Sequence, residues 1–439
     1  MKRLAMFFLP NDVQKNKFWR IHIGAFKEKR YNTALVRDTG LHQLWFVDAA
    51  FDRGLKDVLA NVYHAYHVLR ANRIPAENII PIAYDDIANN PKNPFKGQVF
   101  HDYTHKDVYK DVVIDYRGKD VKPFFFTKVL TGDKKLEREG KKVLKSGPDD
   151  NVFVYYSGHG AYRYISFPEG QLNAAEFNDI FAHMHLKRKY NKLVLYMDSC
   201  NSGSMFLDIL PPDVGIYVTT SAKEDEDSWA IFCDDRRIDA CLATEYSYDW
   251  ITDSETSDLK KRTLDQQYEE VKRRTKDSHV RKYGEMTMGS LPVGKFQGHY
   301  DLLMHQNGGA IAPNVVDKKP SSRVHLFSMS RRLMEATTEE EHEIAWRKLH
   351  RALQLGHIVK ETFHEIAMDV TTHHKPTVKG LSKRDELMCF KAVFDHFRTH
   401  CFTIQQVPEV AQHTVHLMEL CKAGYEAETL IQSVHTVCS

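Results

Sequence analysis

The sequence lacks a long hydrophobic run, because no apolar stretch approaches the roughly 18 residues that a membrane-crossing helix needs. No membrane span is therefore predicted. It also lacks a surplus of either charge: 61 Lys and Arg stand against 59 Asp and Glu, a formal balance of +2. Dedicated nucleic-acid binders carry a clear basic surplus, so DNA and RNA are poor candidate partners. With 42% hydrophobic and 27% charged residues, the composition is that of a globular protein.

A recognisable secretory signal peptide is also missing. Met1, Lys2 and Arg3 supply a basic start, but the apolar run at residues 4–9 is short and meets Pro10 without a small-residue cleavage site. Residues 1–43 show no hydrophobic period and are interpreted as an atypical N-terminal segment. The start of the chain therefore does not indicate a compartment.

Cysteine is absent before residue 200 and is concentrated near the C-terminus. Cys200, Cys233 and Cys241 come first, and the other four of the 7 cysteines stand at positions 389, 401, 421 and 438. Four closely spaced cysteines are typical of two disulfides, and disulfides indicate an oxidising compartment. The C-terminal part therefore favours the secretory route.

Hydrophobic patterning predicts an α/β fold. Short continuous apolar runs predict strands, and apolar residues spaced three or four apart predict helices. Strands are expected at residues 44–50, 79–84, 152–156, 193–197 and 216–218, and helices at 55–74, from 124 and around 177–184. Strands that are apolar throughout and alternate with helices are typical of a mostly parallel sheet with helices on both faces.

Two segments of different character follow the α/β pattern of residues 44–295. Residues 296–323 contain Asn307-Gly308-Gly309 and Pro313 without periodicity, which predicts a linker. From 324 to 439 Gly and Pro are sparse and apolar residues recur every three or four positions. This pattern predicts a separate helical domain.

Two reactive residues follow strongly apolar strands. His159 stands in Ser157-Gly158-His159-Gly160, after the strand at 152–156, and Cys200 follows the strand at 193–197. Catalytic groups gather beyond the carboxyl ends of parallel strands, so these side chains are expected to be neighbours. A thiol beside an imidazole can act as nucleophile and general base. The flanking glycines would let backbone N–H groups approach a developing oxyanion.

Each of these residues also has an ordinary explanation. A lone His in a Gly-rich turn is more often a solvated loop residue, and a Cys at the end of a buried strand is more often an inert hydrophobe. The pairing of both at strand ends is what favours catalysis. A metal site is disfavoured because neither residue has a second Cys or His at ligand spacing.

Two stretches carry a family resemblance: residues 142–160, which end in the His159 motif, and residues 196–205, which contain Asp198-Ser199-Cys200. Together they resemble the legumains, asparaginyl endopeptidases among the caspase-like cysteine peptidases. Further similar stretches at 62–66, 84–88 and 396–402 extend the resemblance from about residue 44 to 439. It implies a caspase-like α/β domain at 44–295, a linker or activation peptide at 296–323, and an all-helical pro-domain at 324–439.

The resemblance also implies a mechanism. His159 would be the general base, Cys200 the nucleophile, and the backbone N–H groups of Gly160 and Cys200 the oxyanion hole. Peptide substrates would be hydrolysed through a thioester, with no cofactor and no metal. The four late cysteines would pair as Cys389–Cys421 and Cys401–Cys438. Cross-links closing loops of this length contribute on the order of 3–4 kcal/mol.

Regulation and location follow from the same resemblance. The helical pro-domain would be an autoinhibitor, and Asn307 and Asn314 would be candidate autocleavage sites. The expected location is the lysosome, the vacuole or the exterior. Of the 24 His, 12 lie in residues 324–439, where 13 Lys and Arg face 15 Asp and Glu. Their protonation would turn a weakly negative pro-domain positive, which predicts release in acid.

The substrate pocket departs from the family pattern. An Asn that orients the catalytic His and an Arg-His pair that binds the substrate Asn are missing from residues 51–61, and Thr244 replaces an acidic residue. Asp198 and Ser228 are assigned to substrate binding, and Arg53 is a candidate to replace the missing Arg. Looser selectivity than strict Asn preference is expected. The alternatives are a catalytically weakened homologue that binds peptides, or a transamidase that joins peptides.

Overall fold

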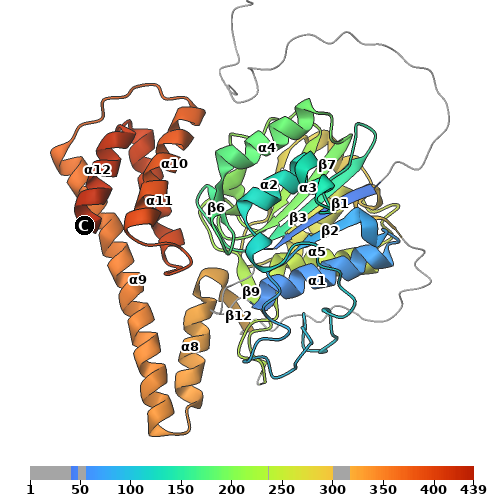
Figure 1. Cartoon of the computed structure of the whole chain (residues 1–439), viewed down its shortest axis with the longest axis horizontal. Helices are drawn as coiled ribbons and strands as arrows, with labels where there is room; N and C mark the ends of the chain where they lie inside the picture. Colours follow the sequence, from blue (N-terminus) through green and yellow to red (C-terminus); the bar gives the residue numbers. More distant parts are fainter. Residues whose placement is uncertain (1–40, 48–55, 236, 300–316) are drawn as a thin grey trace, which may run out of the picture.

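The computed structural model describes residues 41–47, 56–235, 237–299 and 317–439, and its largest sheet has six strands (Figure 1). They lie in the order β11-β8-β7-β3-β1-β2 and pair in parallel, except that β11 runs antiparallel to β8. Their bounds are β1 Leu41–Val47, β2 Ile79–Ile82, β3 Asn151–Ser157, β7 Lys192–Asp198, β8 Ile216–Thr220 and β11 Arg281–Gly284. The predicted α/β class with a mostly parallel sheet is confirmed.

Helices cover both faces of this sheet because successive side chains of a strand point to opposite sides. Phe153 and Tyr155 of β3 pack into one core, and Val152 and Val154 pack into the other. The first core contains helices α1 Lys56–Ala71, α5 Glu245–Thr256 and α6 Leu264–Arg274; the second contains α2 Pro123–Thr131 and α4 Ala174–Leu186. Every residue of β3 is buried, which explains the continuous apolar run at residues 152–156.

Shorter elements surround the carboxyl ends of β3 and β7. One three-stranded sheet, with order β4-β5-β6, begins directly after β3, and another has the order β10-β9-β12. The strands are β4 Gly160–Ala161, β5 Tyr164–Ser166, β6 Gln171–Asn173, β9 Trp229–Ile231, β10 Ala243–Thr244 and β12 Lys318–Pro320. Two short helices are α3 Lys134–Arg138 and α7 Gly294–Gln297, and α7 lies at the other end of β3, where the carbonyl of Lys295 accepts a hydrogen bond from Asn151. These small sheets form the walls around the site described below.

The structure corrects three element boundaries predicted from the sequence. β1 begins at Leu41 rather than at residue 44, and β2 ends at Ile82 rather than 84. The end of the predicted linker is also not entirely loop, because Lys318–Pro320 forms β12 against β9. Three residues are too short to show a period of their own, and only the pairing partner makes them a strand.

The C-terminal region is helical, as predicted, and lies beside the sheet domain (Figure 1). Its helices are α8 Val324–Glu335, α9 Glu339–His373, α10 Lys383–His400, α11 Val410–Ala423 and α12 Ala427–Cys438. Capping boxes begin α9 at Thr338 and α10 at Ser382, where a hydroxyl accepts an N–H and an acidic residue returns the bond. Within the described residues, no helix combines the length and hydropathy needed to cross a membrane.

Two disulfides join the last helices to one another. Cys389 of α10 is bonded to Cys421 of α11, and Cys401 at the end of α10 is bonded to Cys438 of α12. These are the pairs that the resemblance implies. They close loops of 32 and 37 residues.

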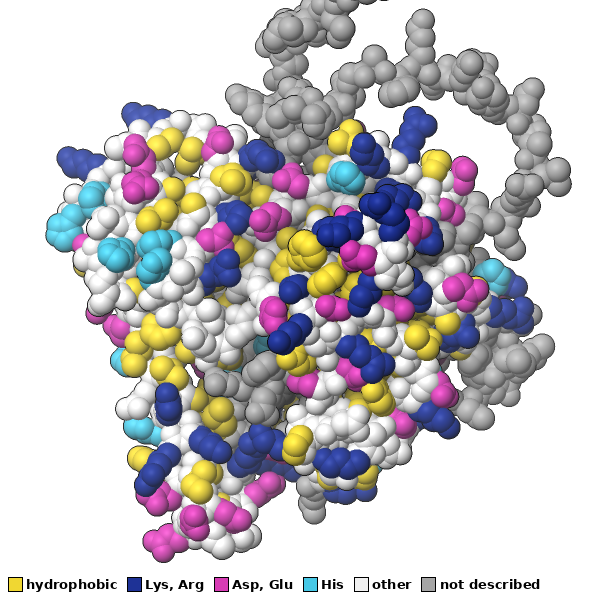
Figure 2. Space-filling model, in the orientation of Figure 1, with side chains coloured by type: hydrophobic (Ala, Val, Ile, Leu, Met, Phe, Trp, Pro, Cys, Tyr) yellow, Lys and Arg dark blue, Asp and Glu magenta, His cyan; other side chains and the backbone are white. Residues whose placement is uncertain are grey.

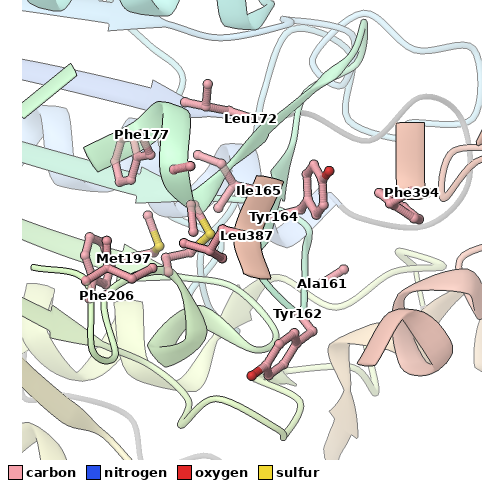
Figure 3. Packing of buried hydrophobic residues seen from close by; sticks show 14 of the residues in the cluster. Ala161, Tyr162, Tyr164, Ile165, Leu172, Phe177, Met197, Phe206, Leu387 and Phe394 are labelled. Atoms are coloured by element: carbon pink, nitrogen blue, oxygen red, sulfur yellow. The ribbon is translucent and has the colours of Figure 1, made fainter. Parts of the chain in front are cut away.

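An apolar contact joins the helical region to the sheet domain (Figure 3). The ring of Phe394 on α10 lies 4.7 Å from that of Tyr164 on β5, and Phe390 lies 5.5 Å from the same ring. Ion pairs flank this contact, from Arg384 to Asp179 and from Lys391 to Glu176. Buried residues from both regions therefore belong to one continuous core.

Basic and acidic side chains are intermixed over the visible face, and His side chains are prominent on the C-terminal helices (Figure 2). Three of these, His396, His400 and His435, form a cluster. The ring centroids of His396 and His400 are 3.9 Å apart, and those of His400 and His435 are 6.0 Å apart. Protonating such a group places like charges next to one another.

Candidate active site

The pairing of β3 with β7 sets the position of the two reactive residues. The strands run parallel in a register that aligns Ser157 with Asp198. His159 and Cys200 each stand two residues beyond these aligned positions, so both emerge at the same edge of the sheet. All seven cysteines lie in the described residues, and Cys200 is the one that is free, with a relative exposure of 5%.

Gly160 brings the backbone after His159 against the backbone of Cys200. A Cβ atom at Gly160 would lie 2.4 Å from the carbonyl oxygen of Cys200 and 2.6 Å from Oγ of Ser199. Real Cβ atoms essentially never approach so closely, so only glycine fits here. The two predicted oxyanion-hole residues are therefore in contact through their main chains.

Ser228, predicted to bind substrate, lies beside the thiol. Its Oγ is 3.7 Å from Sγ of Cys200 and donates a hydrogen bond of 3.2 Å to Oγ of Ser321. The amide of Ser321 in turn donates to the carbonyl of Ser228, at 2.9 Å. The residue after β12 thus contacts Ser228, whose Oγ lies beside the thiol of Cys200.

β12 and β9 show how the chain covers its own site. The strands pair antiparallel, with Pro320 opposite Trp229 and Lys318 opposite Ile231. A strand added to an exposed sheet edge is a common mode of peptide recognition. The next residues continue the contact, because Oγ of Ser322 donates to Asp227 at 2.7 Å.

Electrostatics keep both reactive groups neutral in this closed arrangement. Burial, with a contribution from His325 of α8, lowers the pKa of His159 to about 4. Burial and the neighbouring Asp227 raise the pKa of the Cys200 thiol well above its ordinary value. Since the thiolate is the nucleophilic form, the covered thiol is in an unreactive state.

Asp198, the second predicted substrate-binding residue, is buried in a polar network at the end of β7. Its Oδ2 accepts hydrogen bonds from the hydroxyls of Thr244 and Ser247. Burial raises the pKa of Asp198, while these two bonds act in the opposite direction. Its Oδ1 is buried and has no hydrogen-bond partner among the described residues. A buried carboxylate oxygen without a partner is suited to accept a hydrogen bond from an added donor.

Asn61 of α1 is a site residue that the sequence analysis left without a role. Its Nδ2 donates to Oγ of Ser157 at 3.0 Å and to Oγ1 of Thr244 at 2.7 Å. Asn61 therefore bridges the ends of the two strands. It contacts Ser157 of β3, two residues before His159, and reaches Asp198 of β7, two residues before Cys200, through Thr244. Its partners are 96 and 183 residues away in the chain, so no local signal could have identified it.

A third disulfide, Cys233–Cys241, was also not predicted. β9 and β10 pair with Ile231 opposite Ala243, and continuing this register brings the two cysteines opposite each other. Two cysteines eight residues apart on either side of the charged sequence at 234–237 are the signal that could have found it. The bond braces the hairpin that carries both Thr244 and the edge strand β9.

Three predicted site residues lie outside the described residues. Arg53 falls in the segment 48–55, and the candidate autocleavage residues Asn307 and Asn314 fall in 300–316. The structure therefore gives no position for them.

The fold and the site define a class. A mostly parallel sheet whose adjacent strands end in an imidazole and a free thiol is the arrangement of a cysteine peptidase. Residues 56–299 match the Peptidase C13 family, and residues 343–438 match the legumain prodomain. The chain belongs to the peptidase C13 family and is a cysteine endopeptidase with a C-terminal pro-domain.

Similar proteins from distant organisms span nearly the whole chain. A hemoglobinase of Schistosoma japonicum is 42% identical over 398 residues, covering 90% of this chain and 92% of its own length. Legumain of Bos taurus is 36% identical over 413 residues, covering 91% and 94%. The vacuolar-processing enzyme delta-isozyme of Arabidopsis thaliana is 32% identical, covering 87% and 86%. The resemblance to the legumains is thereby confirmed.

Proposed function

We propose that this chain is the zymogen of an endopeptidase that cleaves peptide bonds after Asn, with Cys200 as nucleophile and His159 as general base. The observation that carries the proposal is the β3–β7 register, which brings the thiol and the imidazole to one edge of the sheet. His159 would take the thiol proton, and the thiolate would attack the substrate carbonyl. The C–N bond then breaks, the amine leaves with the proton from His159, and a thioester with Cys200 remains. Water would then hydrolyse the thioester, while the main-chain N–H groups of Gly160 and Cys200 stabilise each oxyanion.

Asp198 supports the preference for Asn. Its Oδ1 is buried and unpartnered among the described residues, so the amide N–H of an Asn side chain would satisfy it. Thr244, which occupies an expected acidic position, already donates to Oδ2 and offers no second negative charge. We therefore expect cleavage after Asn to be favoured, but less strictly than in a pocket with additional charged partners.

The helical pro-domain, residues 324–439 in our assignment, would inhibit the domain at 44–295 until the linker at 296–323 is cut. This is supported by β12 on the edge strand β9, by Ser321 beside Ser228, and by His325 near His159. The resemblance to the legumains favours the lysosome, the vacuole or the exterior as location, and the name of the vacuolar-processing enzyme among the relatives supports the vacuole. Acid would release the pro-domain, and Asn307 and Asn314 would be the cleavage points.

A peptide library tests this function. The purified chain would be acidified to allow activation and then incubated with peptides that differ only at the cleavage position: Asn, Asp, Gln or Ala. We expect turnover highest with Asn, labelling of Cys200 by an active-site electrophile, and no turnover by the Cys200→Ser variant. Binding of the Asn peptide without turnover by the wild type would instead indicate a catalytically weakened peptide-binding protein.

A further inference from the structure

A chain of hydrogen bonds runs from the surface to Asp198 through two histidines outside the reactive pair. Nε2 of His64 lies 2.9 Å from Oε1 of Glu255, and Nδ1 of His64 lies 2.7 Å from Nδ1 of His101. Nε2 of His101 then lies 2.7 Å from Oδ1 of Asn61. Asn61 continues to Thr244, and Thr244 to Asp198. We call this series, from Glu255 to Asp198, the relay.

The direction of every bond in the relay can be derived from one backbone amide. The N–H of Thr244 can only donate, and it donates to Oδ1 of Asn61 at 3.2 Å. That atom is therefore the amide oxygen, and His101 must donate to it from Nε2. His101 is fully enclosed, and its burial, together with the charge of His64, lowers its pKa well below the ordinary value. His101 is neutral, so its Nδ1 carries no proton and accepts a hydrogen bond from Nδ1–H of His64.

His64 is consequently doubly protonated. Its Nδ1 donates to His101, and its Nε2 faces a carboxylate oxygen, which is an acceptor. Both ring nitrogens must carry hydrogen, which makes His64 an imidazolium paired with Glu255. Its side chain is 12% exposed and that of Glu255 is 35% exposed, so the proton can exchange with solvent. If His64 loses one of its two ring protons, it also loses one of its hydrogen bonds to Glu255 and His101.

The surroundings of His64 do not favour either charge overall. A surface cavity of about 390 Å³ opens beside it. The charged and titratable groups lining it are His67 and Arg70 from α1, Lys106, Asp107, Lys110 and Asp111 from the segment before α2, and Glu255 from α5. The three basic groups equal the three acidic ones only when Glu255 is included, so the direct contact with Glu255 is the interaction that favours an imidazolium. On the inner side, the ring of His101 faces Tyr248 at 5.5 Å.

We propose that His64 and His101 are positioning residues that hold Asn61, Thr244 and Asp198 in the substrate-binding arrangement only while His64 is an imidazolium. From Nδ1 of His64 onward, every donor in the relay points toward Asp198, while Nε2 of His64 donates to Glu255. The positive charge of His64 therefore supports the carboxylate of Asp198 at the far end. Loss of the proton would loosen Asn61, which bridges the ends of β3 and β7. This inference rests on the proposed function, since it assigns Asp198 to the substrate.

The Glu255→Gln variant tests the relay most sharply. A Gln amide can donate to Nε2 of His64, so a neutral His64 would keep both of its bonds. The alkaline fall in kcat/KM for an Asn peptide should then move to higher pH. His101→Phe should lower kcat/KM by about tenfold and reduce the discrimination between Asn and Ala. His67→Gln is the control, because His67 lines the same cavity but contacts the carbonyl of Val108 instead.

A second measurement does not depend on turnover. Nitrogen-15 NMR of the histidine-labelled full chain reports which ring nitrogens carry protons, with assignments from His64→Gln and His101→Gln. We expect His101 as the Nε2–H tautomer and His64 as an imidazolium that becomes neutral in Glu255→Gln at the same pH. Finding His64 neutral in the wild type at pH 6, or a wild-type pH profile in Glu255→Gln, would overturn the relay. If His64 and His101 show the expected protonation states but no peptide is cleaved, the proposed function is refuted and the relay is not.

Discussion

The sheet domain and the helical pro-domain of this chain are stabilised in different ways. The sheet domain buries entire strands, such as β3 and nearly all of β7, between two layers of helices. The pro-domain joins amphipathic helices and cross-links the last three with two disulfides. A small helical unit buries less surface per residue, so cross-links contribute more of its stability. Conditions that destabilise the pro-domain can therefore leave the sheet domain unchanged.

The contact between the two regions also differs from the interior of either one. Its centre is apolar, where Phe394 meets Tyr164, but its edge next to the reactive residues is polar and titratable. His325, on α8, is buried there, bonded to Glu409 at 3.1 Å and close enough to His159 to influence its pKa. Acid should therefore act on this edge before it affects the apolar centre.

The largest effect is expected from the reactive pair, which belongs to the sheet domain alone. His159→Ala removes the base that forms the thiolate, and Cys200→Ser removes the thiol itself. Each variant should therefore lower kcat by roughly ten thousandfold or more. The pro-domain should remain bound and the unfolding temperature should be nearly unchanged. Single-turnover kinetics on a linker-cleaved chain measure the loss. Near-normal hydrolysis by His159→Ala would contradict the assignment of the base.

Removing disulfides should separate the stabilities of the two regions. Replacing Cys401 and Cys438 together by Ser should lower the free energy of unfolding of the pro-domain by about 4 kcal/mol, because a 37-residue loop gains freedom in the unfolded state. The pair Cys233 and Cys241 closes a loop of only 8 residues and should contribute about 2–3 kcal/mol. Urea denaturation followed by Trp fluorescence and hydrogen exchange would measure both. An equal loss in both variants would contradict the loop-length argument.

Acid should weaken the pro-domain contact by at least about tenfold between pH 7 and pH 5. In the closed chain the pKa of His159 is about 4, below the ordinary value of about 6.5 to which it returns after release. At a pH between these two pKa values, His159 takes up a proton when the pro-domain is released. The contact between the two parts is therefore complete above pH 6.5 and weakens as pH falls. Burial and the neighbouring His400 and His435 also lower the pKa of His396, which destabilises the pro-domain in the same direction.

A chain with a protease site inserted at residues 307–314 provides the measurement of this acid effect. After cleavage, the affinity of the two parts would be determined by calorimetry at both pH values. His325→Gln should reduce the pH dependence, whereas His357→Gln should not, since the side chain of His357 is 72% exposed. Equal affinity at pH 7 and pH 5 would exclude the acid switch.

The smallest effect is expected in the pocket network. Thr244→Val keeps the side-chain shape but removes the hydroxyl that donates to Asp198, which should cost about 1 kcal/mol, or roughly fivefold, in kcat/KM for an Asn peptide. Turnover of an Ala peptide should change little. Comparing the two substrates in one assay separates a pocket effect from a general loss of activity. An equal decrease for both would show that Thr244 supports folding rather than selectivity.

Much of the fold was predictable because its signals are local. Apolar runs predicted the positions of β3, β7 and β8, and a period near four predicted the helical pro-domain. Boundaries were less accurate where a neighbour decides them, as at the start of β1 and in β12. The position of His159 and Cys200 at one edge of the sheet was also predictable, because two strands of equal length that end in His and Cys motifs place those motifs at one edge whenever they are paired in parallel.

The sequence by itself therefore determined the alternation of strands and helices, the family, and the two residues that stand after β3 and β7. Tertiary structure alone decided which distant groups meet. Asn61, His101 and Thr244 come from three separated elements, Cys233 faces Cys241 because of the β9–β10 register, and Ser321 reaches Ser228 because β12 joins β9. Periodicity reports which side of an element is buried, whereas partners far apart in the chain are selected only when the elements pack.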